Sequence, residues 1–121
     1  MQVYCGIDIV YIPRFKDTVE KHGPVNMDNP FIKKVYNKEE LIHILPKQVP
    51  YSSLAGRFAA KEAVIKALCS IKKITVLKDV SIIGELPTVL LDKTLNLTDL
   101  KFSISISHDG EYAIAMATVT V

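Results

Sequence analysis

The first ten residues alternate between two kinds of position, so that an extended chain would present two different faces. The odd face holds Val3, Cys5, Ile7 and Ile9, and the even face holds Tyr4, Gly6, Asp8 and Val10. A period of two is typical of a β-strand, because successive side chains point to opposite sides. The pattern predicts a first strand over residues 2–10.

Three short helices are predicted in the next 35 positions. Pro13 suits the first turn of one helix, and Asn29 stands where the cap of a second helix is expected. Asn37, followed three residues later by Glu40, resembles a capping box. It predicts a third helix that runs to about Leu45.

The longest helix is predicted from about Ser52 to Ser70, in a stretch that is rich in alanine and contains no proline. Helical geometry places its residues on two apolar stripes, Leu54, Phe58, Ile65 and Cys69 on one and Ala55, Ala59, Ala63 and Ala67 on the other. A helix that is apolar around most of its circumference is expected to be largely buried.

After this helix the period returns to two. Residues 79–85 and 88–91 are predicted as strands around Pro87, and residues 101–108 and 111–121 as two more. Asp109-Gly110 fits a type I′ turn, which would make the last two strands a hairpin. The order of elements predicts an α+β fold, a mostly antiparallel sheet packed against one long helix with additional short helices.

Length and composition agree with one domain over residues 1–121. With 49% hydrophobic residues in 121, the chain can bury a sizeable core. Its net charge of +2 is too small for a polybasic nucleic-acid binder, and no strand shows the aromatic pattern of an RNA-binding sheet. An anionic ligand or an acidic protein partner remains compatible with this charge.

The chain has no apolar run approaching the roughly 18 residues of a membrane span, and its start lacks the layout of a signal peptide. We therefore expect a cytoplasmic protein that does not enter membranes. Cys5 and Cys69 have neither metal-ligand nor redox spacing, and we interpret both as small buried hydrophobic residues.

Two acidic residues stand in apolar surroundings. Asp8 lies within the first strand and shares a face with Gly6, which would let a ligand approach the backbone. Glu62 borders the large apolar stripe of the long helix, with Lys66 one turn further on. A buried carboxylate is costly unless it is paired or binds a cation. Together the two carboxylates indicate a site for one divalent cation and a phosphate ester.

Structural alternatives to this site stay open. Glu62 and Lys66 also fit an ordinary i,i+4 pair on a solvated face. Asp8 equally fits the end of a strand, after a β-bulge at Gly6.

Hydroxyl and imidazole groups follow one another near the end of the chain. Ser103, Ser105 and Ser107 alternate along a predicted strand, which is most often a solvated face. Ser107 and His108 would donate to a phosphate if the strand end faces the helix that carries Glu62. A catalytic serine is not indicated, because no acid partner for His108 is apparent.

Three segments in order resemble the holo-acyl-carrier-protein synthases, the short stand-alone members of the 4′-phosphopantetheinyl transferase superfamily. They are residues 6–10 with Arg14, residues 54–63 with Lys66, and residues 105–108 before Tyr112-Ala113. The run Arg57-Phe58-Ala59-Ala60-Lys61-Glu62-Ala63 is the most specific of the three.

The resemblance implies transfer of the 4′-phosphopantetheine group from coenzyme A to a serine of an apo acyl carrier protein, as in fatty acid biosynthesis. It implies Mg²⁺ as the cofactor, held by Asp8 and Glu62 beside the coenzyme pyrophosphate. Asp8, Glu62 and Lys66 would be the catalytic residues. Glu39 is a further candidate that would polarise a water, although a favourable helix-dipole charge also explains its position.

Coenzyme-binding and partner-binding roles are implied in the same way. The resemblance places the coenzyme against five residues, Arg57, Lys61, Lys66, Ser107 and His108. Arg14 matches the position that meets the acidic helix of the carrier protein. The short members of the family assemble as homotrimers with sites between neighbouring subunits, which implies a homotrimer here.

The chain departs from the family pattern at two points. The glycine-rich turn that usually follows the long helix is replaced by residues 69–73, and Ile65 stands where a smaller residue is common. A non-catalytic module that binds coenzyme A or a carrier protein is the alternative function. Retention of Asp8, Glu62 and Lys66 argues against it.

Overall fold

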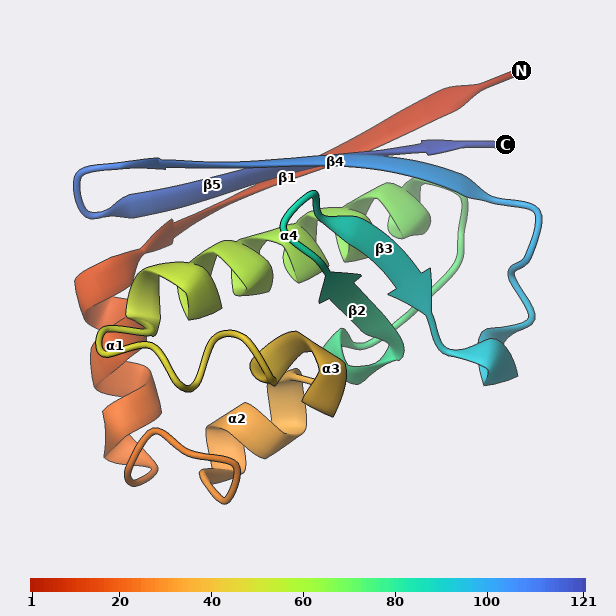
Figure 1. Cartoon of the computed structure of the whole chain (residues 1–121). Helices are drawn as coiled ribbons and strands as arrows, with labels where there is room; N and C mark the ends of the chain where they lie inside the picture. Colours follow the sequence, from red (N-terminus) through yellow and green to blue (C-terminus); the bar gives the residue numbers. More distant parts are fainter.

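The computed structural model describes residues 1–121 and confirms the α+β fold (Figure 1). Its elements in order are β1 Val3–Tyr11, α1 Ile12–Lys21, α2 Pro30–Val35, α3 Lys38–Leu41, α4 Tyr51–Ser70, β2 Val80–Ile83, β3 Thr88–Leu91, β4 Lys101–Asp109 and β5 Tyr112–Thr120. Two 3₁₀ turns, η1 Leu77–Asp79 and η2 Lys93–Leu95, precede β2 and follow β3. No helix is both long enough and apolar enough to span a bilayer.

The strands form two antiparallel sheets. The larger sheet has the order β1-β5-β4, and β2 pairs only with β3 in a separate hairpin. Figure 1 shows α4 lying along one face of the larger sheet, with α1, α2 and α3 further from the sheet and no element over its other face. Helix α4 is therefore the centre of the fold and is largely buried, as predicted.

The contact between α4 and the sheet is close because both surfaces carry small residues. The alanine stripe of α4 is buried, and so are three alanines of β5, Ala113, Ala115 and Ala117. A Cβ atom on Gly6 would clash with the Ala63 carbonyl oxygen and would lie 2.8 Å from the Ala67 nitrogen. The expectation that Gly6 lets a ligand approach is wrong, because the backbone of α4 occupies that space.

The even positions of β1 face α4, and the odd positions point away from it. Val3, Ile7 and Ile9 are 58%, 56% and 62% exposed on the outer face. Cys5 lies on this same face, and Cys69 lies in the last turn of α4; both are exposed. The prediction that both cysteines are buried is therefore wrong.

Two local predictions in the first half of the chain are resolved. The Asn29 side chain accepts hydrogen bonds from the N–H groups of Phe31 and Ile32 at 2.9 and 3.2 Å, which confirms the cap of α2. The third helix is shorter than predicted and ends at Leu41. Irregular turns continue to Pro46, which lacks the N–H needed to extend a helix.

The hairpin between β4 and β5 forms, but its turn differs from the prediction. Asp109 pairs with Tyr112, so the central turn residues are Gly110 and Glu111. Only Gly110 has a positive φ, +57°, which matches a type II′ turn and not type I′. The strand predicted over residues 79–85 is likewise shorter, because Gly84 with φ +90° begins the turn to β3.

Candidate active site

Asp8, Glu62 and Lys66 meet where β1 crosses α4. The Lys66 Nζ atom donates to the Ile7 carbonyl oxygen at 2.8 Å and lies 3.2 Å from Asp8 Oδ1. The Lys66 side chain is 53% exposed and that of Asp8 is 18% exposed, so the pair is open to solvent. Residues far apart in the sequence thus converge at one surface.

Glu62 carries a perturbed carboxyl group at this surface. Partial burial raises the pKa of Glu62, the negative charge of Asp8 raises it further, and Lys66 opposes the shift. The influence of Asp8 on Glu62 means that the two carboxylates interact across the strand and the helix. We define Asp8, Glu62 and Lys66 as the carboxylate site.

The carboxylate site has the donor chemistry of a magnesium site. No three side chains of His, Cys, Asp and Glu lie together in the structure, so a metal held by protein ligands alone is not indicated. Mg²⁺ is commonly bound by only one or two carboxylates, with water and substrate phosphate as the remaining ligands. Two repelling carboxylates fit this requirement, because a cation between them would relieve their repulsion.

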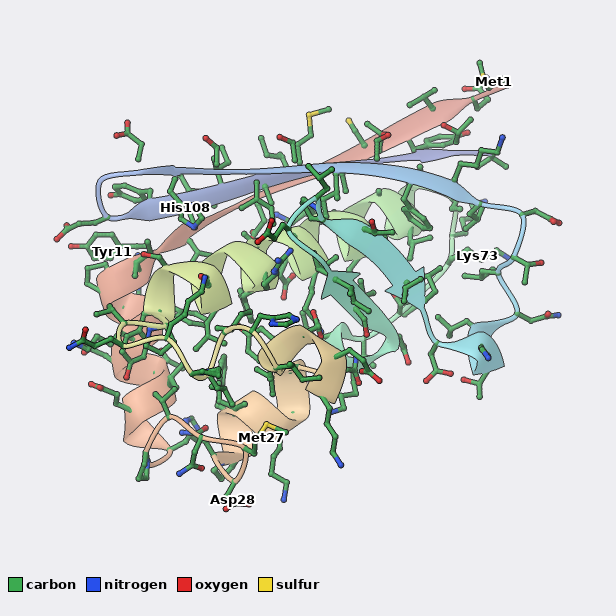
Figure 2. All side chains as sticks on the ribbon, in the orientation of Figure 1. Met1, Tyr11, Met27, Asp28, Lys73 and His108 are labelled. Atoms are coloured by element: carbon green, nitrogen blue, oxygen red, sulfur yellow. The ribbon has the colours of Figure 1, made fainter.

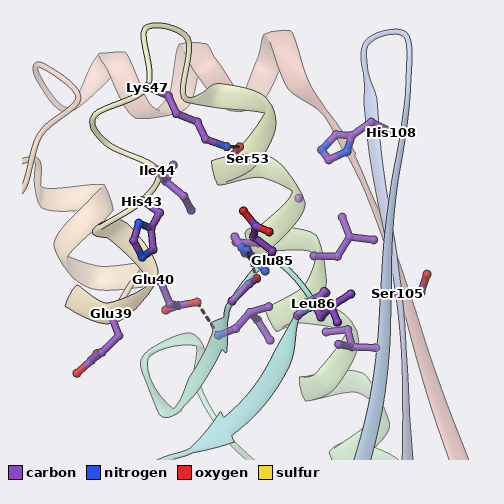
Figure 3. A pocket seen from close by; sticks show the side chains of 17 residues that line it. Glu39, Glu40, His43, Ile44, Lys47, Ser53, Glu85, Leu86, Ser105 and His108 are labelled. Carbon is purple, nitrogen blue, oxygen red and sulfur yellow. Dashed lines mark hydrogen bonds between the residues drawn. The ribbon is translucent and has the colours of Figure 1, made fainter.

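A second feature, which we call the pocket, lies on the other flank of α4. It has a volume of about 860 Å³ and is bounded by α3, α4, β4 and the turn between β2 and β3 (Figure 3). Its charged and imidazole side chains are Glu39, Glu40, His43, Lys47, Arg57, Glu85 and His108. This size suits a small organic ligand.

Three basic side chains of the pocket have a hydrogen-bond partner within the chain. Arg57 Nη2 donates to the Gly84 carbonyl oxygen at 2.7 Å, and Lys47 Nζ donates to Ser53 Oγ at 2.7 Å. His108 Nε2 lies 2.9 Å from the Ser52 carbonyl oxygen. A carbonyl only accepts, so Nε2 carries the proton in this hydrogen bond. The partners of these three side chains are neutral oxygens, and an anion would be a stronger acceptor for them.

The two features do not form one site within a single chain. The carboxylate site lies at β1 and the pocket lies at β4, which are the opposite edges of the larger sheet. Arg57 and His108 therefore lie at the β4 flank of α4, whereas Asp8 and Glu62 lie at its β1 flank.

Lys61 is not at the surface where a coenzyme would bind. Its Nζ atom is 2.6 Å from Glu40 Oε1, and both side chains are fully buried. Nζ also lies 5.4 Å from the centre of the Tyr36 ring, and burial lowers the pKa of Lys61. The place of Lys61 in the predicted coenzyme-binding set thus lacks a structural basis.

Sequence reasoning missed the importance of Glu40. Its Oε1 accepts from the Asn37 N–H at 2.9 Å, as in half of a capping box, and its Oε2 accepts from the Ile82 N–H at 2.9 Å. The Asn37 side-chain amide also donates to Ser81 Oγ and to the Lys78 carbonyl oxygen. The capping signal found Glu40 but explained only one of its three partners.

The remaining predicted residues are dispersed. Ser107 is exposed on the outer face of β4, opposite to His108, so the two side chains do not approach one ligand from the same side. The sequence could have predicted this separation, because the side chains of adjacent residues in a strand point to opposite faces of the sheet. Glu39 is exposed at the pocket, and Arg14 is exposed on α1.

Comparisons with known sequences assign a family. The model of the 4′-phosphopantetheinyl transferase superfamily matches residues 4–117. The holo-[acyl-carrier-protein] synthase of Chlamydia trachomatis serovar D is 37% identical over 117 residues, which cover 93% of this chain and 94% of the relative. The enzyme of the same name from Clostridium kluyveri is 37% identical over 124 residues, 96% of this chain and 88% of the relative.

Solved structures agree with this assignment. The fold matches an ACPS–CoA complex of Chronobacterium ammoniagenes with a TM-score of 0.77 at 26% identity, over 98% of this chain and 97% of that one. It matches the Helicobacter pylori holo-[acyl-carrier-protein] synthase in complex with coenzyme A with a TM-score of 0.76 at 31% identity, over 96% and 99% of the two chains.

Proposed function

Because the chain belongs to the 4′-phosphopantetheinyl transferase superfamily, we propose that it transfers the 4′-phosphopantetheine group of coenzyme A to a serine of an apo acyl carrier protein. The products are the holo carrier and adenosine 3′,5′-bisphosphate. The observation that carries this function is the convergence of Asp8, Glu62 and Lys66 at one exposed surface. The protein is an enzyme of this family.

The reaction exchanges one phosphorus–oxygen bond for another. The serine oxygen of the carrier bonds to the phosphorus that bears pantetheine, and the bond from that phosphorus to the bisphosphate breaks. The serine proton passes to Glu62 or to a water beside it.

Asp8 and Glu62 would hold the Mg²⁺ ion, which when bound offsets the negative charge that develops on the pyrophosphate. The Lys66 ammonium donates to Asp8 and to the Ile7 carbonyl oxygen in this structure, and Lys66 lies one helical turn from Glu62. Its positive charge would stabilise the departing bisphosphate. The three residues thus act on the reacting end of coenzyme A.

Arg57 and His108 would bind the nucleotide end of coenzyme A in the pocket at β4. Lys47 lines the same pocket and adds a third positive group. The Arg57 guanidinium now binds a neutral carbonyl, and a phosphate would offer it a stronger, charge-assisted partner. This assignment requires the pocket of one chain to approach the carboxylate site of another.

The oligomer that meets this requirement is a homotrimer with an active site at each junction. The uncovered face of the larger sheet supports association, since Ile7, Ile9 and Met116 are 56%, 62% and 47% exposed there. The number of three comes from the family resemblance.

Mixing Asp8→Asn chains with Arg57→Ala chains tests the shared site, because random reassembly creates some junctions with neither substitution. Recovered transfer supports the junction, and no recovery after confirmed subunit exchange contradicts it.

Arg14 is exposed on α1 and would bind the acidic helix of the carrier protein. We expect the enzyme to act in the cytoplasm, in the supply of holo carrier for fatty acid biosynthesis. An Arg14→Glu variant is expected to bind the carrier weakly while coenzyme A affinity stays near that of the wild type.

One experiment tests the function directly. The protein is incubated with coenzyme A, Mg²⁺ and an apo carrier, and the carrier is examined by mass spectrometry. We expect a phosphopantetheine adduct on the carrier serine with the wild type and none with Glu62→Gln. Coenzyme binding without an adduct on several carriers would favour a non-catalytic module.

A further inference from the structure

Tyr11 lies between two side chains of opposite charge at the junction of β1 and α1. Its hydroxyl donates to Glu111 Oε2 at 3.2 Å, and the Arg14 guanidinium carbon lies 5.5 Å from the centre of its ring. Figure 2 shows Tyr11 at this junction, near the turn between β4 and β5. We call Tyr11, Arg14 and Glu111 the Tyr11 cluster.

The backbone fixes the relative positions of the cluster. The Ile12 N–H donates to the Glu111 carbonyl oxygen at 2.8 Å, which ties the start of α1 to the β4–β5 turn. The Tyr11 and Tyr112 rings pack with their centres 5.2 Å apart, which restricts the Tyr11 ring further. Glu111 and Arg14 are therefore each held beside Tyr11 by structure that does not depend on their charges.

Arg14 and Glu111 are nevertheless not an ion pair. The structure contains two salt bridges, Lys61–Glu40 and Lys66–Asp8, and neither involves the Tyr11 cluster. The Tyr11 hydroxyl engages the carboxylate, and the face of the same ring engages the guanidinium at a distance typical of a cation–π contact. Tyr11 thus satisfies each charge separately.

We propose that Tyr11 is a positioning residue that keeps the Arg14 guanidinium free of Glu111, so that it is available to an acidic surface of the carrier protein. This inference rests on the proposed function. Exposed ion pairs are weak, so competition from Glu111 would reduce carrier binding several-fold without abolishing it. A reduction of this size alters carrier selection while leaving the chemistry intact.

The test compares Tyr11→Phe, Glu111→Gln and the double variant in steady-state transfer assays. Tyr11→Phe keeps the ring but frees the carboxylate, so we expect the carrier KM to rise about two- to five-fold, most strongly at low salt. The kcat value and the coenzyme A KM should not change. The double variant should return the carrier KM to the wild-type value, because Gln cannot compete for Arg14 as an ion.

A merely structural role predicts a different pattern. Loss of packing would raise the carrier KM in the double variant as well, and it would persist in an Arg14→Ala background. A carrier KM unchanged by Tyr11→Phe, a rise not reversed by Glu111→Gln, or a rise that persists with Arg14→Ala would each overturn the proposal. The wild type serves as the control for the proposed function, since absence of any transfer contradicts that function and not the cluster.

A second measurement tests the cluster without any activity. The hydrogen bond to Glu111 raises the pKa of the Tyr11 phenol. Ring resonances followed by NMR during an alkaline titration should place the Tyr11 pKa above the ordinary value in the wild type and lower in Glu111→Gln. Identical titrations in the two proteins would contradict the Tyr11–Glu111 contact and with it the proposal.

Discussion

The two flanks of α4 carry two ion pairs whose lysines are five residues apart but whose surroundings are opposite. On one flank, Lys61 and Glu40 are 2.6 Å apart with both side chains fully buried. On the other flank, Lys66 and Asp8 are 3.2 Å apart with side chains 53% and 18% exposed. We call them the buried pair and the open pair.

The difference lies in how completely each charge is satisfied. In the buried pair, Glu40 accepts hydrogen bonds from Lys61 and from the N–H groups of Asn37 and Ile82, which joins α3, α4 and β2. In the open pair, one lysine faces two carboxylates, because Glu62 lies beside Asp8. The buried pair is neutral and complete, whereas the open pair retains negative charge that a cation can neutralise.

The largest expected effect comes from breaking each pair by the same substitution. Lys61→Met leaves the Glu40 carboxylate buried without a counter-charge, and we expect the free energy of unfolding to fall by about 3–5 kcal/mol. Lys66→Met removes an exposed pair, so it should change stability by less than about 1 kcal/mol while transfer is lost. Urea denaturation at fixed protein concentration measures both changes in stability, and the carrier assay measures transfer.

The double variant Glu40→Gln/Lys61→Met is the matched control for the buried pair. It removes both charges but keeps an acceptor for only one of the Asn37 and Ile82 N–H groups, because glutamine has a single side-chain oxygen, so it should recover part of the stability lost in Lys61→Met. Similar losses for Lys61→Met and Lys66→Met would remove the distinction between the flanks.

Gly6→Ala tests the packing that brings the open pair together. The added Cβ atom clashes with the Ala63 carbonyl oxygen of α4, so β1 must move outward. We expect a loss of about 1–3 kcal/mol in stability and weaker Mg²⁺ binding, because Asp8 moves with the strand. Normal Mg²⁺ affinity in Gly6→Ala would argue against this coupling.

Glu→Gln substitutions on the two flanks should change the free energy of unfolding in opposite directions. Glu40→Gln weakens a satisfied buried pair and lowers stability. Glu62→Gln removes a carboxylate whose pKa is raised by burial and by Asp8, so it should raise stability in chelator-treated protein. A decrease for Glu62→Gln at neutral pH contradicts the account.

The gain from Glu62→Gln should depend on pH. Because the folded-state pKa of Glu62 lies above its unfolded value, the wild type loses stability as pH rises from the unfolded to the folded pKa. The difference between Glu62→Gln and the wild type should therefore grow through this interval and then stay constant. A series of urea denaturations at different pH values measures it.

The smallest expected effect concerns the end of α4, beyond both pairs. Lys72 has φ +61°, and the Lys73 N–H donates to the Leu68 carbonyl at 2.9 Å, as in a Schellman motif whose left-handed residue is usually glycine. Lys72→Gly should therefore stabilise the protein by about 1 kcal/mol. Thermal unfolding measures the change, and Lys73→Gly, without the strained backbone, should not stabilise.

Local signals in the sequence predicted much of the fold, and they predicted the open pair but not the buried pair. Prolines, caps and alanine content located the helices, and the unusual settings of Asp8 and Glu62 located the open pair. The buried pair escaped because Lys61 meets Glu40 only through the folding of α3 against α4, and no local pattern encodes that contact. The outward direction of Ile7 was not predicted because the odd face of β1 is the more apolar of the two, so alternation alone favours burial of the face that the structure exposes.

The central claim is that Asp8 and Glu62 bind one divalent cation together on the open flank of α4. Isothermal titration with Mg²⁺, in the presence of coenzyme A, tests it most directly with the wild type, Asp8→Asn, Glu62→Gln and the double variant. We predict one ion per chain for the wild type and a similar, strong loss of affinity in all three variants, because each disrupts the same site. Wild-type affinity in either single variant, or losses that add in the double variant as for two independent sites, would contradict the claim.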